Sequence, residues 1–133
     1  MAKRIRRAVL FDPSEHSVQV QLVIALAYML RPEIYFFAIP NQSNRHINNA
    51  MKMQAEGVRS GVADLCFMFP ADEGSIGWLE MKKKRGGTLR TEQKGFRAIC
   101  ARLGHRWAMA KSIDEAIDIL RGWNALKPGA VIL

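Results

Sequence analysis

Apolar positions along the chain follow two spacings, and these spacings predict alternating helices and strands. After Ser14, a good helix cap, apolar residues recur at helical spacing as far as about Leu30: Val18, Leu22, Ala25, Leu26 and Met29. Arg31-Pro32 ends this helix. The aromatic and β-branched run from Ile34 to Ile39 predicts a central strand.

The middle of the chain predicts an antiparallel hairpin. Two apolar runs, Ala63 to Phe69 and Ile76 to Met81, have the length and composition of buried strands. Pro70 to Ser75, between them, has the composition of a turn. A polar helix from His46 to Glu56, ended by Gly57, is expected before the hairpin.

The last part of the chain predicts a helix, a strand and a second helix. Thr91 is placed to cap a helix whose apolar face carries Phe96, Ile99, Cys100 and Leu103. His105 to Ala110 predicts a fourth strand. Ser112 and Glu115 form a capping box for the final helix, whose apolar side carries Ile113, Ala116, Ile117 and Leu120. Gly122 is expected beyond the end of that helix.

The order of these elements predicts the fold class. Without the polar helix, the order is helix-strand-strand-strand-helix-strand, followed by a terminal helix. This order indicates an α/β domain with a small mixed sheet between helices. A length of 133 residues fits a single domain, so we expect one domain over residues 1–133, with a basic arm at residues 1–13.

Two acids and a lysine are expected to meet on the hairpin. Antiparallel pairing brings Asp64 near Glu80, and Glu80 and Lys82 point to the same face because side chains alternate along a strand. Paired carboxylates suit Mg²⁺ or Mn²⁺, and an adjacent lysine can orient a water for phosphodiester hydrolysis. On spacing alone, a structural ion pair of Lys82 with Asp64 or Glu80 is the more frequent explanation, because buried charges must pair.

Three segments around these residues carry a family resemblance: Glu56-Gly57-Val58-Arg59-Ser60-Gly61-Val62-Ala63-Asp64-Leu65, Leu79-Glu80-Met81-Lys82 and Gly87-Thr88-Leu89-Arg90-Thr91-Glu92-Gln93. They resemble the VRR-NUC (virus-type replication–repair nuclease) family, a branch of the PD-(D/E)xK nuclease superfamily, and the resemblance extends from about Ser14 to Trp123. Ala63 stands where the family typically has proline before the aspartate. That proline shapes the backbone rather than the chemistry, so the match is only slightly weakened.

The resemblance implies a restriction-endonuclease-like core and a metal-dependent DNA endonuclease that leaves 5′-phosphate and 3′-hydroxyl ends. It also implies a preference for branched DNA, such as four-way junctions, over a particular base sequence. Asp64, Glu80 and the Met81 backbone carbonyl are the expected ligands of Mg²⁺ or Mn²⁺, with Lys82 as a catalytic residue. Gln93 is expected to hydrogen-bond the catalytic lysine or the phosphate, although glutamine at such a position is more often a surface residue.

Glu15 is expected to act as a further metal ligand or to support one, again by resemblance. An acid in the first turn of a helix is explained equally well by its favourable interaction with the helix dipole.

Positive charge is concentrated after the hairpin. The chain has 20 Lys and Arg against 12 Asp and Glu, a net charge of +8. From Lys82 to Lys111, ten basic residues stand against Glu92 alone, or +9. Such a distribution is typical of a polyanion binder, with a generally basic surface or affinity for a membrane surface as the alternative. The expected DNA contacts are Lys83, Lys84, Arg85, Arg90, Lys94, Asn41 and Arg45.

The composition limits the class and the location of the protein. A hydrophobic content of 49% argues against disorder. No apolar run reaches membrane-spanning length, and no secretory signal is evident. Cys66 and Cys100 lack metal-site spacing and are expected to be reduced core residues. We therefore expect a cytoplasmic protein; its small size and the family name fit a phage-encoded DNA-repair nuclease acting in the host cell.

Two other functions stay open. One is a non-catalytic basic DNA-binding protein whose acids and lysine form only ion pairs, and the other is an RNA-directed nuclease. A homodimer is expected, because one active site cuts one strand and a two-fold dimer cuts both. The apolar segments Ala8–Phe11 and Ala130–Leu133 either supply that interface or pack within their own subunit.

Overall fold

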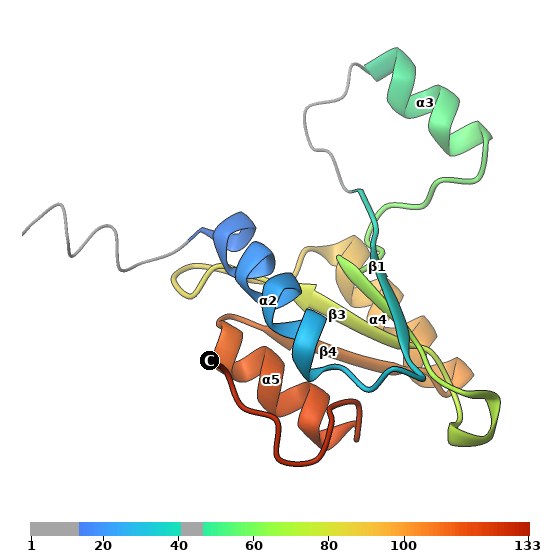
Figure 1. The fold of residues 1–133 in the computed structure, drawn as a ribbon. Coiled ribbons are helices and arrows are strands. Elements are labelled where there is room, and N and C mark those ends of the chain that lie inside the picture. Colours follow the sequence, from blue (N-terminus) through green and yellow to red (C-terminus); the bar gives the residue numbers. More distant parts are fainter. Residues whose placement is uncertain (1–13, 41–46) are drawn as a thin grey trace, which may run out of the picture. The chain divides into compact units, whose positions relative to one another are not determined.

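The computed structural model describes residues 14–40 and 47–133 and divides the chain into two compact units. Unit 1 holds the described residues up to Ile34, with Glu80–Thr88 and Ala108–Leu133, and unit 2 holds Tyr35–Leu79 and Leu89–Trp107. The predicted arm at residues 1–13 lies outside the described residues. Each unit is considered by itself below (Figure 1).

Unit 1 is built on helices α2 (Glu15–Met29) and α5 (Ile113–Gly122), which pack against each other (Figure 1). The Ser14 hydroxyl accepts a 3.1 Å hydrogen bond from the Ser17 N–H and caps α2, as predicted. The whole predicted apolar face of α2 is buried: Val18, Leu22, Ala25, Leu26 and Met29. Burying each large side chain of this kind stabilises the unit by about 1.5–3 kcal/mol.

Helix α5 begins at the predicted cap but ends differently. The Ser112 hydroxyl accepts a hydrogen bond from the Glu115 N–H, while the Glu115 carboxylate accepts one from the Lys111 N–H instead of closing the box on Ser112. Ala116, Ile117 and Leu120 are buried, as predicted, and Ile113 is half-buried. The prediction for Gly122 was wrong, because Gly122 is the last residue of the helix.

The end of the chain returns to α2. The Lys127 N–H donates a 2.8 Å hydrogen bond to the Met29 carbonyl, and Leu30 forms an isolated antiparallel bridge with Leu126. The Arg31 guanidinium also donates to the Asn124 carbonyl at 2.9 Å. The bond from Lys127 uses a carbonyl left without a helical partner where α2 ends.

Unit 2 contains the predicted hairpin. Strands β2 (Leu65–Met68) and β3 (Gly77–Met81) are antiparallel, with Leu65 opposite Leu79, and a short 3-10 helix, η1 (Ala71–Glu73), lies in the turn between them. Strand β1 (Tyr35–Ala38) pairs with the other edge of β2, also antiparallel. The prediction of a central strand here was wrong, because β1 stands at the edge of the sheet. Helix α3 (Ile47–Ala55) connects β1 to β2 and ends close to the predicted Gly57.

The four strands form one sheet in the order β1-β2-β3-β4, in which β4 is Arg106–Ala110. The Arg106 N–H donates to the Ile76 carbonyl, and the Lys82 N–H donates to the Ala110 carbonyl. Both strands therefore advance in the same direction, and β4 is parallel to β3. The predicted small mixed sheet and its element order are confirmed.

Helix α4 (Thr91–Leu103) differs from its predicted form. Its cap position is Arg90 rather than Thr91, which is the first helical residue, and Gly104 follows the helix in the left-handed conformation. Cys100 is buried and Phe96 half-buried, but Ile99 and Leu103, predicted on the buried face, are exposed. The polar Gln93 is buried instead, one turn before Phe96 on the same side of the helix.

The two cysteines lie in the core of unit 2. Both are free and each is 2% exposed, as expected of reduced core residues. Burial raises the pKa of the Cys66 thiol to about 11 and also raises the pKa of the Cys100 thiol. The reactive thiolate is therefore scarce below pH 9.

We predict that neither cysteine reacts with a thiol reagent such as DTNB at pH 8 while the protein is folded. Both should react within seconds in guanidinium chloride. The release of thionitrobenzoate measures each case. Rapid labelling of the folded protein at pH 8 would contradict the burial of these thiols.

No helix in the described part of the chain is both long and apolar enough to cross a bilayer.

Candidate functional site

Glu80 and Lys82 lie together at the end of β3 in unit 1. The Glu80 carboxylate is 3% exposed, and the Lys82 ammonium lies 3.9 Å from its Oε2 atom. At that distance the two groups attract each other without forming a direct hydrogen bond. The predicted same-face placement of Glu80 and Lys82 is consistent with this contact. Burying this charged pair costs desolvation free energy. Proteins seldom keep such a pair unless it has a structural or chemical use.

A backbone hydrogen bond attaches Lys82 to the neighbouring strand, β4. Its N–H donates a 2.9 Å hydrogen bond to the carbonyl of Ala110, which is fully buried at the end of β4. Met81, between Glu80 and Lys82, is also buried, so its side chain anchors the strand end in the apolar core. Because side chains alternate along a strand, Glu80 and Lys82 point to the face opposite to that of Met81.

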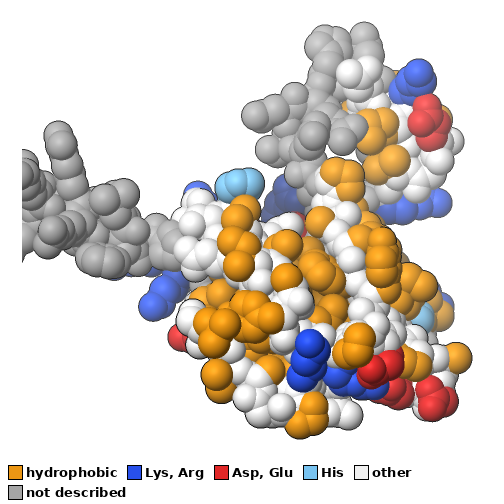
Figure 2. Space-filling view, viewed as in Figure 1, with side chains coloured by type: hydrophobic (Ala, Val, Ile, Leu, Met, Phe, Trp, Pro, Cys, Tyr) orange, Lys and Arg blue, Asp and Glu red, His pale blue; other side chains and the backbone are white. Residues whose placement is uncertain are grey.

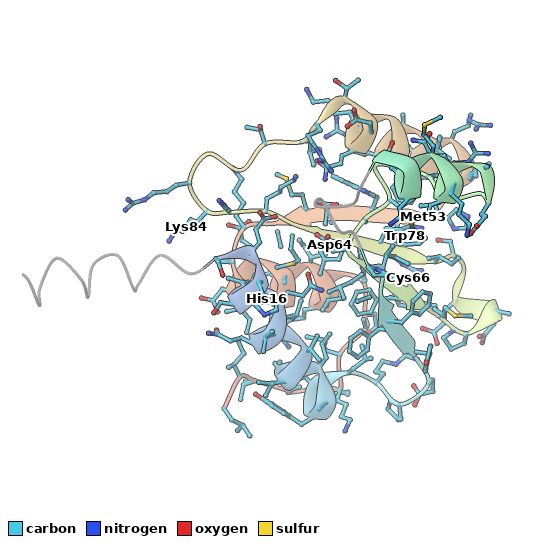
Figure 3. The ribbon with its side chains drawn as sticks, turned by 90° about the horizontal axis from the view of Figure 1, so that it is seen from above. His16, Met53, Asp64, Cys66, Trp78 and Lys84 are labelled. Carbon is cyan, nitrogen blue, oxygen red and sulfur yellow. The ribbon has the colours of Figure 1, made fainter. Side chains whose placement is uncertain are left out.

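Asp64 lies in unit 2, directly before β2. Its carbonyl accepts a 2.8 Å hydrogen bond from the Ile39 N–H, which extends the β1–β2 pairing by one residue. Asp64 is half-buried and takes part in further interactions, and Figure 3 labels it near Cys66 of β2 and Trp78 of β3. Leu65, the next residue, is opposite Leu79, which directly precedes Glu80 in the chain.

Gly61 brings the chain that leads to Asp64 against the first turn of α4. Gly61 is buried and has a φ of +90°, and an added Cβ atom would lie 2.3 Å from the Glu92 carbonyl oxygen. Only glycine fits such a contact, since no side chain can occupy the space of a backbone oxygen. Gly61 is therefore required by the backbone geometry of this segment.

Gln93 has a structural role in that same turn. Its Oε1 atom accepts a 2.9 Å hydrogen bond from the Arg90 N–H and so caps the start of α4. The side chain is 5% exposed, which excludes the surface role considered from the sequence. A contact of Gln93 with a catalytic lysine or a phosphate stays a prediction, and the carbonyl oxygen of its amide already serves the helix.

The basic loop after β3 presents its cations to solvent. Lys83, Lys84 and Arg85 are exposed, and Lys84 projects from the loop in Figure 3. Gly87 closes the loop, because a Cβ atom there would lie 2.2 Å from the Lys83 carbonyl oxygen. The loop is therefore folded back on itself and displays three adjacent positive side chains.

Two further predicted DNA contacts, Arg90 and Lys94, are exposed around the start of α4 in unit 2. Arg90 lies 4.0 Å from the exposed Glu92 carboxylate, a pair that contributes little to stability in water. Asn41 and Arg45, also predicted to contact DNA, lie outside the described residues.

Arg106 has a role that the sequence did not reveal. Its guanidinium donates to the Ser75 and Glu73 carbonyls at 2.7 and 2.8 Å and lies 3.8 Å from the centre of the Phe69 ring. Arg106 therefore fixes the turn between β2 and β3 and belongs to the fold rather than to a surface for polyanions. Its basic charge in the sequence gave no signal of this, because the partners are backbone carbonyls.

Trp78 packs against another aromatic side chain within unit 2. The Trp78 ring meets Phe96 of α4 edge-on, with centres 5.1 Å apart. This T-shaped arrangement is favourable for aromatic pairs and attaches α4 to the hairpin.

Glu15 is half-buried in the first turn of α2. Among residues 14–40 and 47–133, no group of three or more His, Cys, Asp or Glu side chains is arranged to hold a metal ion. A metal-binding role for Glu15 stays a prediction, and the helix dipole accounts for an acid at this position.

Comparisons with known proteins support the fold. No family model matches the chain, and no curated protein matches it in sequence. A solved structure described as a VRR_NUC domain protein aligns with a TM-score of 0.63 and 21% sequence identity. The alignment covers 84% of this chain and 88% of that chain. The fold implied by the sequence resemblance is therefore confirmed: the chain has the fold of a VRR_NUC domain protein.

Proposed function

We propose that this protein is a metal-dependent DNA endonuclease in which Asp64, Glu80 and Lys82 act together. The observation that carries the proposal is the buried Glu80 carboxylate beside the Lys82 ammonium. Leu79, the residue before Glu80, pairs with Leu65, the residue after Asp64. A one-residue continuation of that antiparallel register would make Asp64 and Glu80 partners with side chains on one face. The fold shared with a VRR_NUC domain protein supports the same function.

The donor set fits Mg²⁺ or Mn²⁺. Asp64 and Glu80 would offer hard carboxylate oxygens, and Met81 would offer a backbone carbonyl. Mg²⁺ keeps several waters and is commonly held by only one or two protein carboxylates together with substrate phosphate, so a larger acidic cluster is not required. When bound, the ion would supply Lewis-acid stabilisation of the scissile phosphate.

The side chains of the protein would position the attacking water and stabilise the charge that develops during hydrolysis. In hydrolysis, a water oxygen forms a bond to phosphorus, the bond from phosphorus to the 3′ oxygen breaks, and that oxygen takes a proton. Lys82 orients the attacking water and stabilises the negative charge that develops on the phosphoryl oxygens. Glu80, 3.9 Å away, restrains the ammonium in this position.

The exposed cations set the substrate class. Lys83, Lys84 and Arg85 directly follow Lys82 and bind the phosphate backbone, as do Arg90 and Lys94. Backbone contacts of this kind carry no base information, which favours recognition of DNA shape, such as a four-way junction, over recognition of a sequence. Two copies of the chain would then cut two strands of a branched substrate.

A cleavage panel tests the proposal. Labelled single strands, duplexes, flaps and four-way junctions, each as DNA and as matched RNA, are incubated with the protein and Mg²⁺ or Mn²⁺. The proposal predicts that junction or flap DNA is cut fastest, with 5′-phosphate and 3′-hydroxyl products. Faster cleavage of RNA would identify the RNA-directed alternative. Tight DNA binding without cleavage of any substrate would identify the non-catalytic DNA-binding protein.

Gly61 provides a test of how Asp64 is held in place. We predict that Gly61→Ala lowers the cleavage rate on the order of a hundredfold, because the loop before Asp64 must move away from the Glu92 carbonyl. Cleavage of labelled junction DNA, together with thermal unfolding, measures the effect.

Gly57→Ala is the matched control. Gly57 has a φ of +103° in the same segment, but an added Cβ atom there meets no atom within 4 Å. Both variants carry a conformational cost of about 1–3 kcal/mol, whereas only Gly61→Ala has the steric conflict. Equal loss of cleavage in the two variants would refute the positioning role of Gly61.

A further inference from the structure

The Lys82 side chain is held more closely than its contact with Glu80 explains. A lysine ammonium ends a flexible four-carbon stem, and the 3.9 Å between this ammonium and the Glu80 Oε2 atom is too long for a hydrogen bond. The Lys82 side chain is nevertheless only 12% exposed, whereas Lys83 and Lys84, which follow it, are exposed. Another part of unit 1 therefore restrains the Lys82 stem.

Gly87, also in unit 1, lies against the start of that stem. A Cβ atom added at Gly87 would lie 3.0 Å from the Lys82 Cβ atom. It would also lie 2.2 Å from the carbonyl oxygen and 2.8 Å from the amide nitrogen of Lys83. Because carbon atoms of packed groups stay about 3.5–4.0 Å apart, no side chain fits at position 87. The bare backbone of Gly87 covers Lys82 and Lys83 instead.

Gly86 shows that this close approach belongs to Gly87 alone within the turn. Gly86 has a φ of +70°, but an added Cβ atom there would meet no atom within 4 Å. Gly87 is not among the glycines of positive φ. Glycine at position 86 therefore serves the backbone conformation, and glycine at position 87 serves the contact with Lys82 and Lys83.

The same contact closes the basic loop between β3 and α4. Figure 2 shows Lys and Arg side chains where this loop projects in Figure 1. The exposed cations Lys83, Lys84 and Arg85 lie between Lys82 and Gly87 in the chain. Gly87 therefore connects the lysine proposed for catalysis with the cations proposed to bind the phosphate backbone.

We propose that Gly87 is a positioning residue for Lys82, because its backbone closes the loop against the Lys82 stem and holds the ammonium beside the buried Glu80 carboxylate. A catalytic side chain keeps its productive geometry when packing by its neighbours fixes its rotamer. A methyl group at position 87 would displace the Lys82 stem or the Lys83 peptide. The effect on cleavage rests on the proposed function, whereas the placement of Lys82 is measured without DNA.

Chemical labelling tests the placement of Lys82. The folded protein is treated briefly with a limiting amount of acetic anhydride, then unfolded and cut after glutamate, which releases residues 81–92 as one peptide. Tandem mass spectrometry gives the labelled fraction of each lysine in that peptide. In the wild-type protein, Lys82 should be labelled more slowly than Lys83 and Lys84. Gly87→Ala should abolish this difference.

A double-mutant cycle tests whether Gly87 acts through Lys82. Gly87→Ala should lower the single-turnover rate of junction cleavage about a hundredfold, with DNA affinity nearly unchanged because the loop keeps its charges. In the Lys82→Met background, Gly87→Ala should cause no further loss, since the group that it positions is gone. A general role of Gly87 in the fold predicts losses that multiply instead.

Gly86→Ala is the matched control, because it adds the same methyl group one residue earlier without a steric conflict. It should keep Lys82 protected from acetylation and cut DNA close to the wild-type rate. Thermal unfolding is measured on every variant. Protected Lys82 in Gly87→Ala, multiplying losses in the cycle, or an unfolded Gly87→Ala protein would each overturn the positioning role. If the wild-type protein cuts no DNA but Gly87→Ala still exposes Lys82, the nuclease assignment is wrong while the contact between Gly87 and Lys82 stands.

Discussion

Lys82→Met is expected to lower the rate of DNA cleavage on the order of a hundredfold or more while the protein stays folded. Methionine keeps the length and the apolar part of the side chain but removes the ammonium that lies 3.9 Å from Glu80. The loss is expected in kcat rather than in DNA affinity, because Lys83, Lys84 and Arg85 remain available to the phosphate backbone. Single-turnover cleavage and DNA binding are measured on the same preparation.

Lys83→Met is the matched control, since Lys83 is an exposed lysine one residue further along. It should reduce DNA binding slightly, with a smaller dependence on salt, and leave kcat nearly unchanged. Equal effects of the two substitutions on kcat would remove Lys82 from the catalytic group.

A double variant separates catalysis from a structural ion pair. Breaking a buried pair costs about 3–5 kcal/mol because one charge is left alone, whereas removing both charges is often neutral. Glu80→Gln with Lys82→Met should therefore unfold near the wild-type temperature under either explanation. A catalytic pair leaves this stable double variant inactive. If the pair is only structural, the double variant should regain both stability and cleavage. That outcome would contradict the proposed role of Lys82.

Asp64→Asn is expected to lower cleavage on the order of a thousandfold, the equivalent of several kcal/mol of lost charge stabilisation in the transition state. Asparagine has nearly the same shape, and the Asp64 carbonyl can still accept its hydrogen bond from Ile39. Divalent-metal affinity should fall, and DNA affinity should hold or rise because a negative charge near phosphate is removed. Calorimetric Mg²⁺ titration and a DNA-binding assay measure these effects.

Asp72→Asn serves as the control for Asp64→Asn, because Asp72 is an exposed acid in the short helix η1 of the same unit. It should cut DNA at the wild-type rate and bind Mg²⁺ with unchanged affinity. A loss of cleavage in Asp72→Asn comparable with that in Asp64→Asn would show that general charge, and not a specific carboxylate, governs the rate.

The sequence predicted the strand segments and the two serine helix caps because these depend on local chemistry, whereas Thr91 was wrongly expected to cap α4. Ser14 and Ser112 both cap helices, and the hairpin of β2 and β3 has the predicted antiparallel pairing. The five buried residues of α2 are those predicted as its apolar face. In each case, the residues that determine the structure are close neighbours in the chain.

Helix α4 shows where spacing is insufficient. Phe96, Ile99, Cys100 and Leu103 form an apolar stripe, but the buried side is rotated toward Gln93, which leaves Ile99 and Leu103 exposed. Gln93 is buried because its amide caps the helix and Gly61 lies against the same turn. A polar residue buried through a hydrogen bond to backbone has no hydrophobic signal in the sequence.

Helix α2 shows the complementary difficulty, because its apolar residues surround the helix and spacing alone does not say which of them face solvent.

The site itself was predictable in part. Glu80 and Lys82 lie close together, as alternation along a strand requires, whereas the joint action of Asp64 with them stays a prediction drawn from strand register.

Nicking of supercoiled plasmid and of a labelled four-way junction tests the central claim most directly. The account predicts that the wild-type protein cuts in Mg²⁺, that EDTA stops the reaction, and that excess Mg²⁺ restores it. It also predicts that Asp64→Asn, with a wild-type melting temperature, does not cut in any of these conditions. Undiminished cleavage in EDTA, or cleavage by folded Asp64→Asn at the wild-type rate, would contradict a metal-dependent nuclease built on this carboxylate.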